Sequence, residues 1–117
     1  MAGTVRSLSI PGLIARADHT ATVMTDGTVL FAGGHNAAGA PIAKAQIWNP
    51  KSNSVSSWEP QLLAARYRHT AQLLADGMVY IAGGTDGSSK EGLRAEEYDP
   101  ATNLFQPAPL ARKIRDF

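Results

Sequence analysis

The chain repeats itself at an offset of 50 residues, and this repeat limits the fold more than any other feature of the sequence. The segment HTATVMTDGTVLFAGG occupies positions 19–34, and HTAQLLADGMVYIAGG occupies positions 69–84. Without any gap, 17 positions are identical between the two copies, among them Arg16 and Arg66. A chain of 117 residues that contains two such copies is therefore expected to consist of two equivalent structural units.

Each copy has the pattern of four short strands. Apolar runs flank Asp26-Gly27 and Asp76-Gly77, and no stretch has the 3.6-residue periodicity of an amphipathic helix. Asp-Gly between two such runs favours a tight hairpin, and we expect a type I′ turn, in which both central residues have positive φ. Third strands are expected in AQIWNP and AEEYDP, which end at Asx-Pro, and fourth strands in SVSSW and NLFQP. Four antiparallel strands in about 50 residues predict one propeller blade per copy.

The repeated residues, taken as a set, resemble the kelch repeat. The set is Arg-x-x-His, Asp-Gly, Gly-Gly and an aromatic residue before Asx-Pro. It comprises His19, Asp26, Gly27, Gly33, Gly34 and Trp48 in the first copy, and His69, Asp76, Gly77, Gly83, Gly84 and Tyr98 in the second. The resemblance runs from about Thr4 to Arg112 and implies an all-β fold with two four-stranded antiparallel blades of a kelch-type β-propeller. Phe105 departs from the pattern, because it does not align with Trp58, which leaves the position of the closing strand open.

The repeat accounts for too few blades to close a propeller. We treat residues 1–117 as a single kelch-repeat unit. Within it we expect a fourth-strand-like segment and linker at 1–15, blade 1 at 16–65 and blade 2 at 66–117. The segment TVRSLSI aligns with SVSSWEP, so about nine strands are expected, whereas propellers have typically four to eight blades. One expectation is that copies assemble head to tail into a closed ring, in which three copies give six blades and the N-terminal strand joins a neighbouring copy. The other is that the chain is an incomplete piece of a longer array.

Candidate binding residues lie near the starts of the inner strands and in the two loops that differ most between copies, HNAAGAPIAK and TDGSSKEGLR. They are Arg16, Asp18, His35, Asn36, Arg66, Arg68 and Asp86. Arginine at a channel rim can bind a carboxylate through two parallel hydrogen bonds, and the alternative role of Arg16 and Arg66 is to bridge backbone carbonyls or acidic side chains. For His19 and His69 we expect structural hydrogen bonds rather than a metal site. The aromatic residues expected to pack between blades are Trp48, Trp58, Tyr98 and Phe105.

Composition narrows the classes of function. A net charge of +1 argues against nucleic acid as a partner, and no apolar run approaches the roughly 18 residues of a membrane helix. The chain contains no cysteine, which excludes thiol nucleophiles, thiolate metal sites and the Tyr-Cys copper cofactor that some kelch-containing oxidases carry. No signal peptide is recognisable, so a cytoplasmic location is only the default, and no cofactor or metal is expected.

No sequence motif for catalysis is recognisable either, so we do not expect an enzyme. The expected function is a non-catalytic binding or scaffold module whose partners are other copies of itself and a protein or carbohydrate ligand. The alternative is an inert fragment of a larger kelch carbohydrate-active enzyme of the oxidase or epimerase type.

Overall fold

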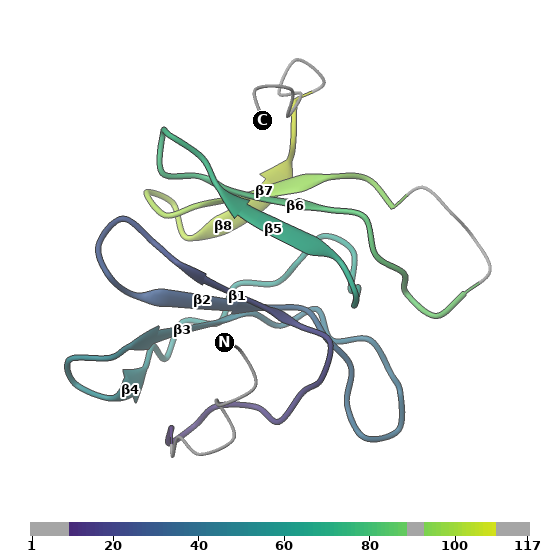
Figure 1. Cartoon of the computed structure of the whole chain (residues 1–117), viewed down its shortest axis with the longest axis horizontal. Coiled ribbons are helices and arrows are strands. Elements are labelled where there is room, and N and C mark those ends of the chain that lie inside the picture. Colours follow the sequence, from purple (N-terminus) through teal and green to yellow (C-terminus); the bar gives the residue numbers. More distant parts are fainter. Residues whose placement is uncertain (1–9, 89–92, 110–117) are drawn as a thin grey trace.

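The chain forms two four-stranded antiparallel sheets in a computed structural model that describes residues 10–88 and 93–109. Blade 1 contains β1 (Thr20–Val23), β2 (Val29–Ala32), β3 (Gln46–Asn49) and β4 (Ser54–Val55). Blade 2 contains β5 (Thr70–Leu73), β6 (Val79–Ala82), β7 (Glu96–Asp99) and β8 (Leu104–Pro107). In both blades the strands lie side by side in chain order (Figure 1). The predicted all-β pair of four-stranded sheets is confirmed, whereas most of the predicted N-terminal strand TVRSLSI lies outside the described residues.

Both Asp-Gly hairpins form, but the predicted type I′ turn is wrong. In the first loop Gly27 has a positive φ of 89° and Asp26 does not, and the Gly27 N–H donates to the carbonyl of Met24 (2.9 Å). A three-residue loop that ends on a left-handed glycine is the G1-bulge form of hairpin. Asp26 stabilises this turn through its side chain, because its Oδ1 accepts the N–H of Thr28 (2.9 Å).

The hydrophobic core lies between the two sheets, which pack face to face (Figure 1). Side chains alternate along a strand, so each blade has two faces. We call the face of blade 2 that packs on blade 1 its near face; it is formed by Ala71, Leu73, Val79, Ile81, Tyr98 and Phe105. It packs against the far face of blade 1, formed by Met24, Leu30, Ala32, Ala45 and Ile47, with Leu62 of the connecting segment buried beside them.

The near face of blade 1 carries the equivalent residues but has no sheet packed against it in the described part of the chain. Val23 is 63% exposed, whereas its equivalent Leu73 packs against the core. Trp48 is half-buried, whereas its equivalent Tyr98 is fully buried. The expectation that four aromatic residues pack between the blades is met by Tyr98 and Phe105; Trp58 is 51% exposed, although its indole N–H donates to the Asn103 carbonyl of blade 2.

The two ends of the blades differ. The long loops that connect β2 to β3 and β6 to β7 leave both sheets at one end, at the right of Figure 1, and the hairpin turns lie at the opposite end. We call the first end the loop face. The inner strands β1 and β5 are neighbours across the two blades. Residues that precede these strands and residues of the long loops are thus brought together on the loop face, at the seam between the blades.

Candidate functional site at the seam between the blades

Arg66 lies in the interior of blade 2 and joins three segments of the chain. Its side chain is fully buried, and its Nη2 donates to the carboxylate of Glu96 (2.9 Å) and to the carbonyl of Arg94 (2.6 Å). Its Nη1 donates to the carbonyl of Gly83 (3.2 Å). The Glu96 carboxylate also accepts the N–H groups of the connecting segment at Leu63 (2.7 Å) and the following residue (3.2 Å). The guanidinium of Arg66 is enclosed and does not lie at an accessible rim; it has the alternative role, in which it bridges backbone carbonyls and an acidic side chain.

Arg16 has the same place in blade 1, with an amide in place of the carboxylate. Its Nη1 donates to the carbonyls of Gly33 and Lys44 (both 2.9 Å), and its Nη2 donates to Oε1 of Gln46 (3.1 Å). Gln46 also accepts the N–H of Ile14 (2.8 Å), as Glu96 does in blade 2. Burial lowers the pKa of Arg16, and the charge of Glu59 acts in the opposite direction. Both arginines therefore hold the glycine pair of their own blade in place.

His69 links the two blades at the inner strands. Its Nε2 lies 2.9 Å from the hydroxyl oxygen of Thr20 in blade 1, and its ring fills the space beside Gly33, where an added Cβ would come within 2.4 Å of the ring. Burial, with the charge of Arg66 as the next cause, lowers the pKa of His69 to about 4. The imidazole is therefore neutral at pH 7, and its Nε2 shares a hydrogen bond with the Thr20 hydroxyl. The buried Nδ1 has no hydrogen-bond partner among the described residues.

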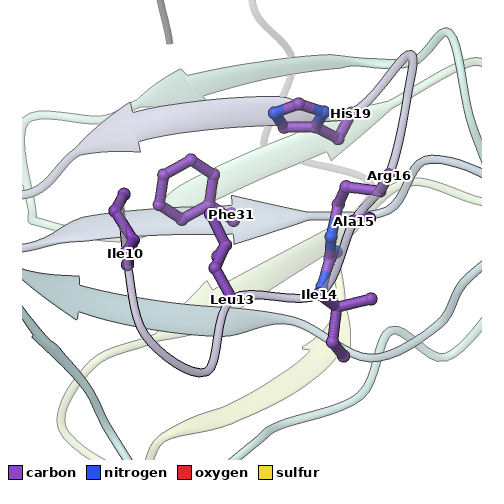
Figure 2. Close-up of a pocket in the computed structure, with 7 residues that line it drawn as sticks. All are labelled: Ile10, Leu13, Ile14, Ala15, Arg16, His19 and Phe31. Atoms are coloured by element: carbon purple, nitrogen blue, oxygen red, sulfur yellow. The ribbon is translucent and has the colours of Figure 1, made fainter. Parts of the chain in front are cut away.

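His19 is the equivalent residue of blade 1. Where His69 contacts a neighbouring blade, His19 lines a pocket. The pocket has a volume of about 230 Å³ and is lined by Ile10, Leu13, Ile14, Ala15, Arg16, His19 and Phe31. In Figure 2 the segment before β1 passes along one side of the Phe31 ring, and His19, directly before β1, lies above the ring. Burial and the charge of Arg16 lower the pKa of His19.

Four side chains meet on the loop face of the seam, and we call them the seam cluster: Asp18, His35, Tyr67 and Arg68. Oδ2 of Asp18 lies 3.0 Å from Nε2 of His35 and 3.5 Å from Nε of Arg68. The His35 ring meets the Tyr67 ring edge-on at 4.9 Å, and the Arg68 guanidinium lies over the same tyrosine at 5.7 Å. The Arg68 side chain is 70% exposed, so the cluster presents a cation to solvent.

Electrostatics of the seam cluster favour a charged pair. The hydrogen bond from His35 lowers the pKa of Asp18, and the charge of Arg68 adds to this. The pKa of His35 is raised, first by its Nδ1 contact with the carbonyl of Asn36 (3.0 Å) and then by Asp18. Both ring nitrogens of His35 thus face acceptors, which stabilises the imidazolium form.

The remaining candidates shape loops. Oδ1 of Asn36 accepts two backbone N–H groups of its own loop, from Ala38 (2.9 Å) and Ala40 (3.0 Å). Asp86 accepts the N–H and the hydroxyl of Ser88 (2.9 and 2.6 Å). The structure therefore brings Asp18, His35 and Arg68 together and leaves Asn36 and Asp86 in separate turns.

Sequence reasoning missed three members of these networks: Gln46, Glu96 and Tyr67. Gln46 and Glu96 occupy equivalent positions but differ in type, so a search for identical residues passes over them. The signal available was a polar acceptor in each third strand, two residues before the aromatic residue. Tyr67 has alanine as its equivalent in the first copy and carried no signal.

Among the described residues, no three His, Asp or Glu side chains lie together in a way that could hold a metal ion. No helix in the described part of the chain is long and apolar enough to cross a membrane.

Two stacked four-stranded sheets, with Gly-Gly at the end of each second strand and the core between the sheets, fit a fragment of a kelch-like β-propeller. No family model matches the chain, and no curated protein matches it. Solved structures do resemble it. YjhT has a TM-score of 0.68 and 18% identity, over 84% of this chain and 38% of its own.

A fungal alcohol oxidase of the AA5 family, in complex with copper, has a TM-score of 0.66 and 18% identity, over 86% of this chain and 23% of its own. Similarity at this level of identity shows the fold. The chain spans less than two-fifths of the length of either protein.

Proposed function

We propose that the chain is a non-catalytic binding or scaffold module: a kelch-type propeller segment that assembles head to tail with copies of itself and binds partners through the loop face. One observation carries this proposal. The near face of blade 1 repeats the apolar face that blade 2 buries, and the far face of blade 2 repeats Thr20, Gly33 and Gly34 of blade 1 as Thr70, Gly83 and Gly84.

The near face of blade 1 supports the proposal residue by residue. Val23, Val29, Phe31 and Trp48 stand where Leu73, Val79, Ile81 and Tyr98 stand in blade 2. In blade 2 these apolar side chains are covered by blade 1, and Val79, Ile81 and Tyr98 have no exposed surface. In blade 1 Val23 is 63% exposed, Val29 and Trp48 are partly exposed, and Phe31 is buried beside the pocket. An apolar sheet face of this kind is expected to be covered by another sheet, because repeat units bury their cores against neighbours.

Binding of a ligand is assigned to the seam cluster and the long loops. Loops on a rigid β scaffold are where binding specificity usually resides. The exposed guanidinium of Arg68 beside the Tyr67 ring suits an acidic protein segment or an acidic sugar, since arginine pairs with carboxylates and aromatic rings pack on apolar surfaces. Each further copy in a ring would present such a surface again at the seam between its own two blades.

The second candidate is that the chain is part of a larger kelch carbohydrate-active enzyme and inert alone. The similarity to the alcohol oxidase, of which the chain spans 23%, favours it. In that case the outer faces would be covered by other blades of the same polypeptide rather than by other copies.

Light scattering coupled to gel filtration separates the two candidates. Self-assembly predicts a solution mass that is a multiple of 12.4 kDa, and the multiple gives the number of blades, with three copies giving six. A folded chain that stays at 12.4 kDa over a hundredfold range of concentration would contradict self-assembly. Circular dichroism on the same fractions establishes that the sheets are formed.

A further inference from the structure

The contact between the two blades of one chain supplies a template for the contact between copies. Besides the ion pair of Asp18 and Arg68, three hydrogen-bond contacts cross it at the inner strands. Nε2 of His69 reaches the hydroxyl of Thr20 (2.9 Å), and the N–H of Gly34 donates to the carbonyl of Arg66 (2.9 Å). The N–H of Arg68 donates to the carbonyl of Asp18 (3.0 Å). We call the histidine side of this contact the plug and the Thr and Gly-Gly side the socket.

Gly33 shows how closely the plug fits the socket. A Cβ at this position would come within 2.4 Å of the His69 ring and 2.6 Å of the Arg66 carbonyl, and the backbone has a φ of 72°. Contacts below 3.0 Å require the neighbour to move, and a backbone carbonyl has little room to do so. Only glycine permits the histidine to enter at this place.

The repeat places a second plug and a second socket at the two ends of the pair. His19 stands on the open near face of blade 1, where it lines the pocket of Figure 2. Thr70, Gly83 and Gly84 stand on the far face of blade 2 and are identical in type to the residues of the filled socket. A Cβ at Gly83 would meet nothing within 4 Å, although its φ of 74° matches that of Gly33. The second socket therefore has its shape but no occupant in the described structure.

We propose that a second copy of this chain docks with its His19 in the socket formed by Thr70 and Gly83 of the first copy. This docking deepens the proposed function and rests on it. The occupant is inferred from continuity with the contact inside the chain: the plug and the socket are the same residue types at both places. Further out the surfaces differ, since Tyr80 and Glu97 replace Leu30 and Ile47, so the complementary contacts between copies lie chiefly at the inner strands.

Charge complementarity supports the same partner. Inside the chain Asp18 of blade 1 pairs with Arg68 of blade 2, and these two residues are equivalents in the repeat. Docking of a second copy brings its Asp18 to the Arg68 of the first copy, so opposite charges again meet at the new seam. A ring built in this way alternates the two charges around its loop face. If two copies docked through the same face of each, two Asp18 or two Arg68 side chains would meet instead, and such like charges repel.

Two variants test the docking from opposite sides. Gly83→Ala fills the open socket, and Val23→Glu places a charge on the open near face at a side chain that is 63% exposed. Each is expected to weaken association at least about tenfold, because an added methyl in a packed contact or a buried unpaired charge disfavours docking. Gly39→Ala is the matched control for backbone strain: Gly39 has a φ of 86° and also has no neighbour within 4 Å.

The decisive measurement is the mass of the two variants alone and mixed in equal amounts. Each alone should stay at 12.4 kDa with the circular dichroism of the unchanged chain, while Gly39→Ala assembles normally. The mixture should form a complex of two chains and stop there, because one intact plug meets one intact socket. If the unchanged chain is itself monomeric, the proposed function fails. If the unchanged chain assembles and Gly83→Ala assembles equally well, the docking is wrong while self-assembly stands.

Discussion

Removal of the Glu96 carboxylate should destabilise the chain far more than removal of the amide at the equivalent position of blade 1. Glu96 is 1% exposed and accepts hydrogen bonds from Arg66 and from two backbone N–H groups of the segment that connects the blades. In Glu96→Ala the guanidinium of Arg66 stays fully buried with carbonyl partners but no counter-charge. Breaking a buried ion pair from one side costs about 3–5 kcal/mol.

The chain contains the control for this prediction. Gln46→Ala removes the acceptor of Ile14 and Arg16 and the donor to Gly12 and Glu59, but no formal charge is lost. Because Gly12 and Glu59 are accessible to water, which can replace the amide N–H, the cost comes chiefly from the two lost acceptor contacts and is about 2 kcal/mol at about 1 kcal/mol per hydrogen bond. Glu96→Gln gives blade 2 the arrangement of blade 1 and should fall between the two.

Urea denaturation followed by circular dichroism, at equal and low protein concentration, measures all three free energies of unfolding. A whole domain is stable by only about 5–15 kcal/mol, so the difference is readily resolved. An equal cost for Glu96→Ala and Gln46→Ala would refute the reasoning that a buried charge, rather than a hydrogen-bond acceptor, is what Arg66 requires.

Three further outcomes are expected. The pKa of His69 falls from 6.5 in the unfolded chain to about 4, so the free energy of unfolding is highest above pH 6.5 and decreases by about 3 kcal/mol in all as the pH falls toward 4. Urea midpoints at several pH values check this, and His69→Gln should lack this pH dependence. Gly33→Ala should lower the thermal midpoint by several degrees more than Gly83→Ala when both are measured as monomers, because only Gly33 faces the histidine ring. Trp58→Phe should cost about 1 kcal/mol in a urea titration through loss of its indole N–H bond to the Asn103 carbonyl (2.7 Å).

The repeat made the strands and hairpins predictable, because apolar alternation and Asp-Gly appear twice at the same spacing. The turn type was not predictable from Asp-Gly alone, since that dipeptide suits both a two-residue loop and a three-residue loop with a left-handed glycine. What decides between them is the pairing of the strands: Val23 pairs with Val29 and the Met24 N–H donates to the Thr28 carbonyl, which leaves three residues in the loop.

The candidate site was predictable only in part, because its members come from segments that the topology brings together. Asp18, His35 and Arg68 drew attention as polar residues near turns, and the structure joins them across two blades. For Arg66 the sequence left two roles open, binding at a channel rim or bridging carbonyls and acidic side chains, and the contacts in the structure match the second. Its burial depends on Glu96, which lies 30 residues further along the chain and has no identical equivalent in the first copy.

The location of the core between the sheets has a consequence for how the chain folds. Neither 50-residue copy encloses an apolar interior by itself, so the smallest cooperative element is the contact of one sheet with the next rather than the sheet. A single copy made alone would remain without stable structure, and each added blade would contribute one complete core. The free energy of unfolding of such a chain increases with the number of blades, as in a linear repeat array. It would be greatest in an assembly in which the last blade also packs against the first.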